Sequence, residues 1–520
     1  MDTVLIVTSG IGSRLGGYTE YTNKSLVRVG PKFAICHIID KYDLKTTRFV
    51  VTVGYYGNLV QELLSLAYPE NTFVYAQVDN FKGPGSSLGY SLLKAREYLQ
   101  CPFTFYCCDS IVLDDIQKPT TNTLYVARSD DSSSYASICT NGKVVLNINE
   151  KGQNNFDYVY TGVSYIHDYA EYWSNLQTKY EENPANTSLG DCQVIDALIK
   201  SGVQFNYTVL EKWFDIGNIY SYNVVCDHFK CEYNVLYKKD ESICFFDDKV
   251  IKFFSSKKKN LDRVERGHSL GTIIPKILGN TEHFFSMELV KGNVLSEYYV
   301  HGEVYNVLNW AKDNLWVNKS TSPSHLTTCQ KFYKDKTFER IASLRIGKEF
   351  DKINGLSLVS ISDILARIDW ESLYTDTFYQ FHGDFIMDNI IKTSDSFKLI
   401  DWRQDFGDEL FLGDMYYDMA KFRHNIIFNH LNVDTGLFTL KIENDEVVVD
   451  LKCNYFLISQ LVDFDRFVYE NNFNLKKIKI LTTLIWLNMS PLHDINISKF
   501  LFYFGKYNLH LELNTPVPIL

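Results

Sequence analysis

The sequence contains no uninterrupted apolar run of the roughly 18 residues that suggest a membrane span. It begins MDTVLIVTSG, without a basic leader or an apolar segment long enough to predict secretion. The 11 cysteines are scattered, and no CxxC pair meets a second one at zinc-finger spacing. We therefore expect reduced thiols, a cytoplasmic location and no insertion into a membrane.

The sequence also contains fewer basic than acidic residues. Lysine and arginine number 52 against 63 aspartates and glutamates, which gives a formal net charge of -11 and a pI near 5.6. A field of this sign opposes binding to nucleic acid, although a local basic pocket for phosphates is compatible with it. We expect small-molecule substrates and nucleotides as partners, and a homo-oligomer is left open.

The sequence has no internal repeat, low-complexity tract or Pro-rich linker, so domains must be inferred from changes in pattern. A chain of 520 residues exceeds what one core usually organises. Residues 1–220 alternate short β-rich runs with amphipathic stretches. This alternation predicts an α/β domain with a mostly parallel sheet and helices on both faces. Ligands of such sheets lie at the carboxyl ends of the strands.

Residues 221–520 follow a different pattern and predict a second, α+β domain. The series NVLYKKDE, SICFFDD and KVIKFFSS, a charged helical segment and HFFSMELV predict a small antiparallel lobe over residues 225–292. Residues 293–520 are expected to form a mostly helical lobe, with a loop-rich interruption near 380–415. The second domain is therefore expected to be bilobal.

Two loops of the first domain carry candidate phosphate-binding groups. The turn SGIGSRLGG follows the run VLIVTS directly, and its backbone amides can surround a triphosphate while Arg14 adds a forked positive charge. Lys24 follows at a distance that lets it return to the same pocket, and Asp109 ends the run FTFYCCD. A glycine-rich turn alone is also compatible with a plain strand-to-helix connection.

The ordered segments SGIGSRL, NKSLVRVG, GPGSSLGYSLLKA, CCDS, NEKG, VYTGVSYI and WFDIGN make residues 1–220 resemble the nucleoside-triphosphate transferases that make sugar nucleotides and CDP-choline. The resemblance implies a Rossmann-like fold. The sequence departs from the family pattern at Asn23, where a proline is usual, and at Cys108, where a glycine is usual.

The transferase resemblance also implies roles for particular residues. The phosphates of the nucleotide would be held by Gly10, Gly12, Ser13 and Arg14, those of the acceptor or the reacting centre by Lys24 and Lys151, and the base or ribose by Gly85 and Ser86. Asp109 and Asp215 would share Mg²⁺. Such cations are needed because two anions must approach each other for displacement at the α-phosphorus.

The strongest local motif of the sequence is HGDFIMDN at residues 382–389, followed by LIDW at 399–402. At this spacing Asp384 can accept a proton from a substrate hydroxyl, Asn389 can reach Mg²⁺, and Asp401 can bind the metal between the β- and γ-phosphates. These residues predict phosphoryl transfer from ATP.

The second domain resembles the aminoglycoside phosphotransferase and choline kinase family, a relative of the protein kinases. The resemblance implies that Lys252 contacts the α- and β-phosphates of ATP and that Glu265 is its ion-pair partner. Asp414 and Asp418 would fix the catalytic loop by hydrogen bonds. No obvious glycine-rich loop precedes SICFF, and the motifs HGD and IDW replace the HRD and DFG of protein kinases, which favours a small-molecule substrate.

Together the resemblances imply a bifunctional enzyme. The kinase would phosphorylate a sugar or polyol with ATP, and the transferase would couple the product to a nucleotide from CTP, UTP, GTP or dTTP, with Mg²⁺ in both domains. Such products usually feed surface polysaccharide assembly. Choline or ethanolamine is the alternative acceptor. Two further alternatives are a regulatory, inactive domain and the phosphorylation of proteins.

Overall fold

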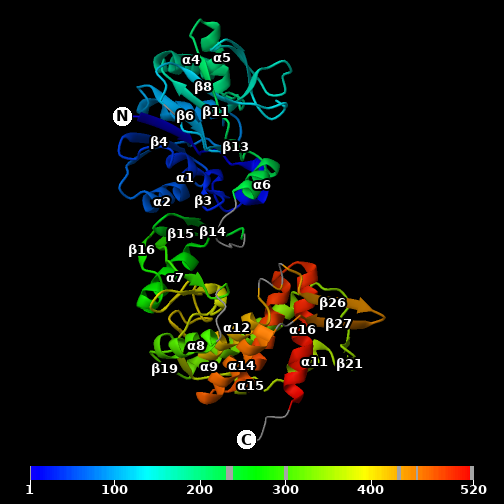
Figure 1. The fold of residues 1–520 in the computed structure, drawn as a ribbon. Coiled ribbons are helices and arrows are strands. Elements are labelled where there is room, and N and C mark those ends of the chain that lie inside the picture. Colours follow the sequence, from blue (N-terminus) through cyan, green and yellow to red (C-terminus); the bar gives the residue numbers. More distant parts are fainter. Residues whose placement is uncertain are drawn as a thin grey trace. The chain divides into compact units, whose positions relative to one another are not determined.

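The computed structural model describes residues 2–116, 118–229, 238–297, 302–429, 432, 435–452 and 455–515. The chain divides into two compact units, Met1–Asn260 with Leu278–Leu289, and Leu261–Ile277 with Val290–Leu520. Figure 1 follows the chain by colour from blue in the first unit to red in the second. In the described part, no helix combines the length and apolar character needed to cross a bilayer, and the nine cysteines are free thiols.

The first unit is built on a nine-stranded sheet. Its strands are β1 Asp2–Val7, β4 Thr47–Val53, β5 Phe73–Gln77, β6 Phe103–Cys107, β8 Thr123–Ala127, β9 Ser137–Asn141, β10 Val144–Asn149, β11 Tyr158–Ile166 and β12 Asn206–Val209. They lie in the order β5-β4-β1-β6-β11-β8-β12-β10-β9. The pairings show that β10 and β11 run opposite to the other seven strands. The mostly parallel sheet predicted from the sequence is confirmed.

Helices cover both faces of this sheet, as predicted. Side chains alternate between the faces of a strand, so Val4 and Ile6 of β1 join one apolar cluster while Leu5 and Val7 join another. The first cluster contains residues of α1 (Ala34–Ile39) and α2 (Gly57–Ala67), and the second contains residues of α3 (Leu88–Ala95), α4 (Tyr169–Glu182) and α5 (Asp191–Lys200). Shorter elements complete the unit, namely η1 Ser13–Thr19, η2 Lys24–Leu26, β2 Arg28–Val29, β3 Lys32–Phe33, η3 Arg96–Tyr98, β7 Ser110–Val112, β13 Trp213–Asp215 and α6 Ile219–His228.

A four-stranded antiparallel sheet also belongs to the first unit by its contacts. Its strands are β14 Glu241–Phe245, β15 Lys249–Phe254, β16 Ile277–Asn280 and β17 Phe284–Glu288. We predicted β14, β15 and β17, but assigned them to the small lobe of the second domain, and we did not predict β16. They group with the first unit because Cys244, Ile251 and Phe284 are buried in the same cluster as α1 and α2. The expected strand NVLYKKDE begins with residues 234–237, which lie outside the described residues.

The second unit is mostly helical, as predicted for residues 293–520. Its helices are α7 Lys257–Leu270, whose first four residues lie in the first unit, α8 Glu303–Asn314, α9 Ser324–Cys329, α10 Lys336–Ala342, α11 Ile361–Ala366, α12 Met415–Ile427, α14 Tyr455–Glu470, α15 Leu475–Met489 and α16 Ile495–Asn514. Helix α15 packs between α12 and α16.

Short strands and turns separate α11 from α12 and form the loop-rich region expected near 380–415. These elements are η6 Glu371–Leu373, β22 Thr377–Gln380, η7 Met387–Asn389, β23 Ile390–Lys392, β24 Phe397–Leu399 and β25 Leu412–Gly413. The remaining short elements are η4 Gly271–Ile273, β18 Asn293–Val294, β19 Ser320–Thr321, the π-helical turn η5 Gln330–Asp335, β20 Lys352–Ile353, β21 Leu356–Ser357, β26 Phe438–Glu443, β27 Glu446–Leu451 and η8 Ser490–Leu492.

Two candidate active sites

The turn that follows β1 has an open surface. Gly12 has a φ of +70°, and a Cβ at this position would lie 2.9 Å from Cβ of Lys24. Glycine therefore allows both the left-handed backbone and the close approach to Lys24. Gly10, Ser13 and Arg14 are exposed on the same turn. The predicted phosphate-binding residues of this segment are thus accessible to a ligand.

Asn23 holds the turn and Lys24 in place. Its side chain is fully buried, and Nδ2 donates hydrogen bonds to the carbonyl oxygens of Thr8 (2.8 Å) and Tyr55 (2.6 Å). Its Oδ1 accepts the backbone N–H of Ser25 at 2.9 Å. We had noted Asn23 only as a departure from the proline that is usual in the family. A proline has no side-chain amide, so Asn23 fixes this turn by bonds that a proline does not make.

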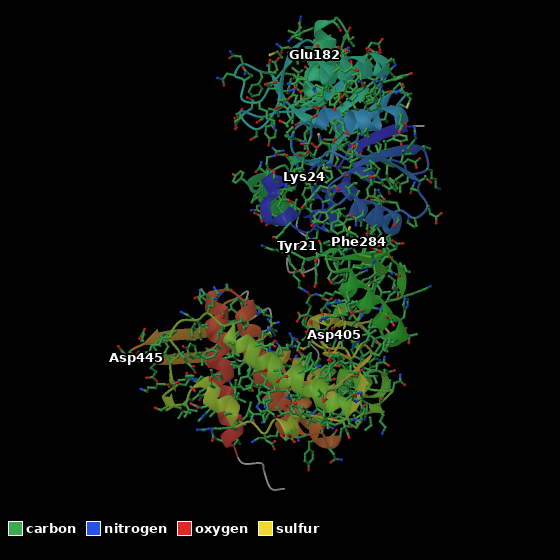
Figure 2. The ribbon with its side chains drawn as sticks, turned by 180° about the vertical axis from the view of Figure 1, so that it is seen from behind. Tyr21, Lys24, Glu182, Phe284, Asp405 and Asp445 are labelled. Atoms are coloured by element: carbon green, nitrogen blue, oxygen red, sulfur yellow. The ribbon has the colours of Figure 1, made fainter. Side chains whose placement is uncertain are left out.

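Three charged side chains of the first unit converge at the ends of β1 and β6. Lys24 Nζ lies 2.5 Å from Asp109 Oδ2, and Arg14 Nη2 lies 3.8 Å from the same oxygen; Figure 2 labels Lys24 in the first unit. Burial raises the pKa of Asp109, but Lys24 and Arg14 outweigh it, so the pKa is below its usual value. Asp109 is therefore ionised at neutral pH.

Asp215 lies beside this cluster, because β13 pairs with β7 directly after Asp109. Its Oδ1 accepts the backbone N–H of Gly217 at 2.8 Å, and its Oδ2 accepts hydrogen bonds from the hydroxyls of Tyr135 (3.3 Å) and Ser221 (3.2 Å). Burial, and then the charge of Asp109, raise the pKa of Asp215. We had missed Tyr135 and Ser221, since neither stands in a motif.

Gly217 separates the two carboxylates and leaves room between them. A Cβ on Gly217 would lie 2.8 Å from Oδ1 of Asp215, 3.2 Å from Oδ2 of Asp109 and 3.5 Å from Nη2 of Arg14. Two hard carboxylate oxygens so close that the charge of Asp109 raises the pKa of Asp215 are suited to a divalent cation such as Mg²⁺. The donor set therefore fits the metal that the sequence predicts.

Three other predicted residues lie elsewhere in the first unit. Gly85 has a φ of +78° and a Cβ there would lie 2.8 Å from the carbonyl oxygen of Pro184, so it serves a tight turn before α3. Ser86 Oγ donates to the carbonyl of Gly83 at 2.6 Å. Lys151 is exposed after β10 and forms no ion pair with a described residue. Contacts of these residues with nucleotide or acceptor stay predictions.

In the second unit, Asp384 and Asn389 lie together in the loop after β22. The Nδ2 of Asn389 donates to the carbonyl oxygen (3.0 Å) and to Oδ2 (3.3 Å) of Asp384. Lys421 of α12 places its Nζ 2.8 Å from Oδ1 of Asp384. Burial raises the pKa of Asp384, but Lys421 outweighs it and keeps the pKa below its usual value. We had not singled out Lys421, which lies three residues after Asp418.

Asp418 fixes this loop by hydrogen bonds, as predicted. It is fully buried and accepts the backbone N–H groups of His382 and Gly383, each at 2.7 Å, and Trp316 Nε1 at 3.1 Å. Burial raises the pKa of Asp418 to about 6. The same role predicted for Asp414 is wrong, because Asp414 caps α12 and pairs with Lys477.

His382 and Arg266 also hold the loop, and sequence reasoning missed both. Burial lowers the pKa of His382 to about 4, so its ring is neutral at pH 7. Its Nε2–H donates to the carbonyl of Ile400 (3.0 Å), which leaves Nδ1 to accept the backbone N–H of Asp384 (3.2 Å). Arg266 of α7 donates to the carbonyl oxygens of Phe381 and Arg403. The loop is thereby tied to its neighbours on both sides.

Asp401 has a left-handed backbone, with a φ of +61°, and an ion-pair partner on α7. Arg263 Nη1 lies 2.6 Å from Asp401 Oδ1, and Trp402 Nε1 donates to the backbone carbonyl of Arg263 at 2.8 Å. A non-glycine residue at such a φ is uncommon and is often found at functional sites. The metal-binding role of Asp401 stays a prediction.

Lys252 and Glu265 were predicted to form an ion pair. Lys252 is buried in β15, whereas Glu265 is exposed on α7. The two residues belong to different units, so their pairing and the contact of Lys252 with ATP stay predictions.

No protein-family model and no curated protein matches the chain. Among solved structures it is similar to a CTP:phosphocholine cytidylyltransferase from Streptococcus pneumoniae (19% identity, TM-score 0.39, 44% of this chain and 100% of that one). It is also similar to an inositol-1-phosphate CTP transferase from T. maritima (17%, 0.36, 45% and 98%) and to a nucleoside-diphosphate-sugar pyrophosphorylase from Vibrio cholerae (15%, 0.37, 43% and 100%). These similarities fall on the N-terminal part of the chain, which resembles nucleotidyltransferases at low identity.

Proposed function

We propose that the chain is a bifunctional enzyme that phosphorylates a small hydroxylated metabolite with ATP and then joins the product to a nucleoside monophosphate taken from a second nucleoside triphosphate. The observation that carries the proposal is the convergence of Arg14 and Lys24 on Asp109, with Asp215 beside them. Cations and metal-binding carboxylates gathered beyond the ends of the parallel strands β1 and β6 suit a reaction between two phosphates.

In the transferase reaction, an oxygen of the acceptor phosphate attacks the α-phosphorus of the triphosphate. The new P–O bond forms as the bond to pyrophosphate breaks, and pyrophosphate leaves. Arg14, exposed on the turn, is positioned to pair with the incoming phosphates. Lys24 adds a second positive charge that Asn23 keeps at the end of β1. Mg²⁺ bound to Asp109 and Asp215 would act as a Lewis acid on the phosphates.

A pyrophosphate-release assay tests this half of the proposal. The purified chain is given CTP, UTP, GTP or dTTP with a panel of phosphorylated sugars and alcohols in the presence of Mg²⁺. Asp109→Asn should lower kcat at least ~100-fold, the loss typical of an electrostatic contact to the reacting centre. Asp115→Asn is the matched control, because this carboxylate is fully exposed. Silence of every combination with the wild-type chain would refute the transferase assignment.

In the kinase reaction, the hydroxyl of the acceptor attacks the γ-phosphorus of ATP, the bond to ADP breaks, and Asp384 accepts the hydroxyl proton. Lys421 keeps Asp384 ionised, as the lowered pKa of Asp384 indicates. Asp418, His382 and Arg266 keep the loop in one geometry, which such positioning requires.

Asp384→Asn tests the kinase half and separates it from the alternative of a regulatory domain. The variant should lose acceptor-dependent ADP release by ~100-fold or more, yet keep pyrophosphate release when a phosphorylated acceptor is supplied. Asp395→Asn, in the exposed turn between β23 and β24, is the control. If Asp384→Asn converted the free acceptor at the wild-type rate, the second unit would not be the kinase.

A further inference from the structure

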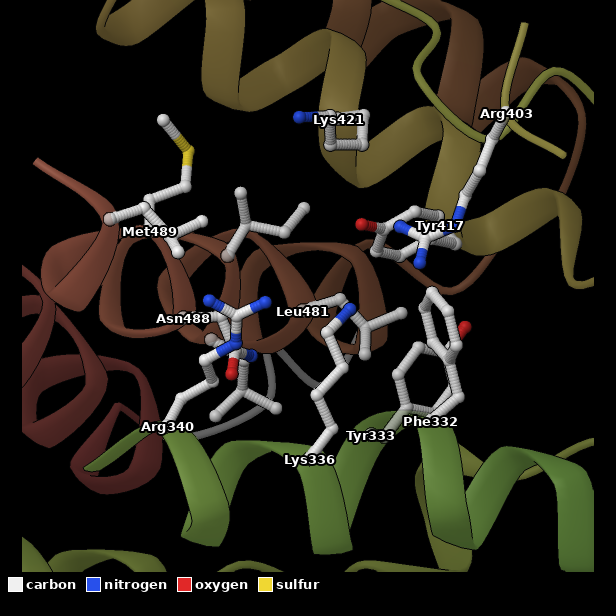
Figure 3. A pocket seen from close by; sticks show the side chains of 13 residues that line it. Phe332, Tyr333, Lys336, Arg340, Arg403, Tyr417, Lys421, Leu481, Asn488 and Met489 are labelled. Atoms are coloured by element: carbon white, nitrogen blue, oxygen red, sulfur yellow. The ribbon is translucent and has the colours of Figure 1, made fainter. Parts of the chain in front are cut away.

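A pocket of about 170 Å³ lies in the second unit between α10, α12 and α15 (Figure 3). Four of its lining residues are cationic, namely Lys336, Arg340, Arg403 and Lys421. Figure 3 shows Lys336 and Arg340 extending from α10 into the pocket, with Lys421 on the opposite side. Apolar side chains of α15, among them Leu481, form much of the remaining lining.

Lys421 connects this pocket to Asp384. It lines the pocket, and its Nζ lies 2.8 Å from Oδ1 of Asp384. A molecule in the pocket is therefore one side chain away from the carboxylate that the proposed kinase reaction uses as its base. This is where the body of a small acceptor would lie while its hydroxyl approaches Asp384.

Carboxylates balance only part of the positive charge in the pocket. Lys421 is paired with Asp384, and Arg403 Nε lies 3.5 Å from Oδ1 of Asp405, which Figure 2 labels. Lys336 and Arg340 have no carboxylate within 4.0 Å in the part of the chain that the structure describes. Burial, and then the charges of Arg403, Arg340 and Lys421, together lower the pKa of Lys336 to about 7.

Several cationic side chains close together beside apolar side chains repel one another, and this repulsion is unfavourable unless an anion binds among them. A quaternary ammonium group such as that of choline would add another positive charge, and a neutral polyol would leave the repulsion unchanged. An anionic group relieves it and can accept charge-assisted hydrogen bonds from Lys336 and Arg340.

We propose that this pocket binds a carboxylate or phosphate group of the phosphoryl acceptor, so that the kinase acts on an acidic hydroxylated metabolite and not on choline or a neutral polyol. The inference rests on the kinase function proposed above. It names Lys336 and Arg340 as the residues that select the acceptor.

Acceptor pairs of matched shape test the selection. ADP release is measured with glycerol, glycerate and glycerol 3-phosphate, and with the corresponding six-carbon polyol, sugar acid and polyol phosphate, with choline alongside. ADP release should be faster with the acid or the phosphate than with its neutral counterpart. Whether the acid or the phosphate gives the faster release identifies the anionic group that the pocket binds. Loss of one charge-assisted bond in Arg340→Gln should raise KM roughly 10- to 100-fold at nearly unchanged kcat. Arg345→Gln is the matched control, since Arg345 is exposed. Faster turnover of choline or of the neutral polyols would overturn the inference.

A binding measurement on the full chain distinguishes failure of the pocket from failure of the kinase. Inorganic phosphate and glycerate are titrated into the wild type and into the Lys336→Met/Arg340→Gln double variant while Tm is recorded. Both anions should raise Tm of the wild type, and at least ~10-fold higher concentrations should be needed with the double variant. If the wild type and the double variant needed equal anion concentrations for the same rise in Tm, the proposal that the pocket binds an anion would be overturned. Selective binding without any phosphoryl transfer would refute the kinase and leave the pocket standing.

Discussion

Gly217 gives the sharpest test of the transferase site, because its replacement by alanine adds one methyl group where two carboxylates and a cation meet. The new Cβ would lie 2.8 Å from Oδ1 of Asp215 and 3.2 Å from Oδ2 of Asp109. Ordinary contacts of a Cβ begin near 3.4 Å, so Asp215 must move by several tenths of an ångström. This movement lengthens the 2.8 Å hydrogen bond from Gly217 N–H, and we expect the bond to be largely lost. Loss of such a bond to a carboxylate corresponds to about 1.5–3 kcal/mol, or roughly 10- to 100-fold in rate.

The assay is pyrophosphate release at saturating substrates, with circular dichroism to check the fold. We expect kcat of Gly217→Ala to fall by this factor and Tm to change little, because the strain is confined to side chains at the surface of the site. Gly190→Ala is the control, since a Cβ there meets nothing closer than 3.4 Å. If Gly217→Ala kept the wild-type kcat and fold, Asp109 and Asp215 would not form a common site, and our reasoning would be refuted.

Three further predictions concern stability. Asn23→Ala should destabilise the first unit by about 2–3 kcal/mol in urea unfolding, because the buried carbonyl of Thr8 and the partly buried carbonyl of Tyr55 each lose a donor. The pKa of His382 is about 4 in the folded chain against an ordinary 6.5, so the unfolded chain holds more protons between these values and stability falls as pH drops through this window. His382→Gln should remove about 3 kcal/mol of that loss of stability, which is measured by comparing Tm at pH 7 and pH 4 in the wild type and the variant. The raised pKa of Asp418 acts in the opposite direction, but it is common to both proteins and cancels when they are compared. Lys336→Met should raise Tm at pH 7 in the absence of anions, because the unfolded chain binds more protons between pH 7 and 10.5 and the folded state loses a repelling charge.

The strands and helices of the first unit were predictable because their apolar patterns are local. The run VLIVTS is buried on both faces, as its continuous apolar character indicates, and α2 is one of the amphipathic stretches expected between the strands. The grouping of β14, β15 and β17 was not predictable. It depends on apolar contacts between Cys244, Ile251, Phe284 and helices some 200 residues earlier, and no local pattern records such contacts.

The charged groups of both candidate sites could be predicted where they stand within motifs that follow a strand, as Asp109 does after β6 and Asp384 after β22. Their partners were harder to find. Tyr135, Arg266 and Lys421 come from distant segments, and each is an ordinary residue of its own loop or helix. Their roles arise only when the fold brings them to a carboxylate or a backbone carbonyl.

The two candidate sites differ in how they balance charge, and this difference indicates what each requires. In the first unit two cations, Arg14 and Lys24, face two carboxylates, so in the proposed transferase reaction these side chains alone would not attract a triphosphate strongly and a divalent cation would supply the excess. In the pocket of the second unit, Lys336 and Arg340 are in excess over the carboxylates, so an anionic acceptor can bind there without a metal. In the proposed two-step reaction, an acidic acceptor would also carry its negative charge into the transferase step after it has been phosphorylated. The first unit would then need more positive charge to bind this acceptor. Arg14 is exposed, and its contact with Asp109 is 3.8 Å long. We therefore expect Arg14 to be the side chain best able to turn toward the additional negative charge.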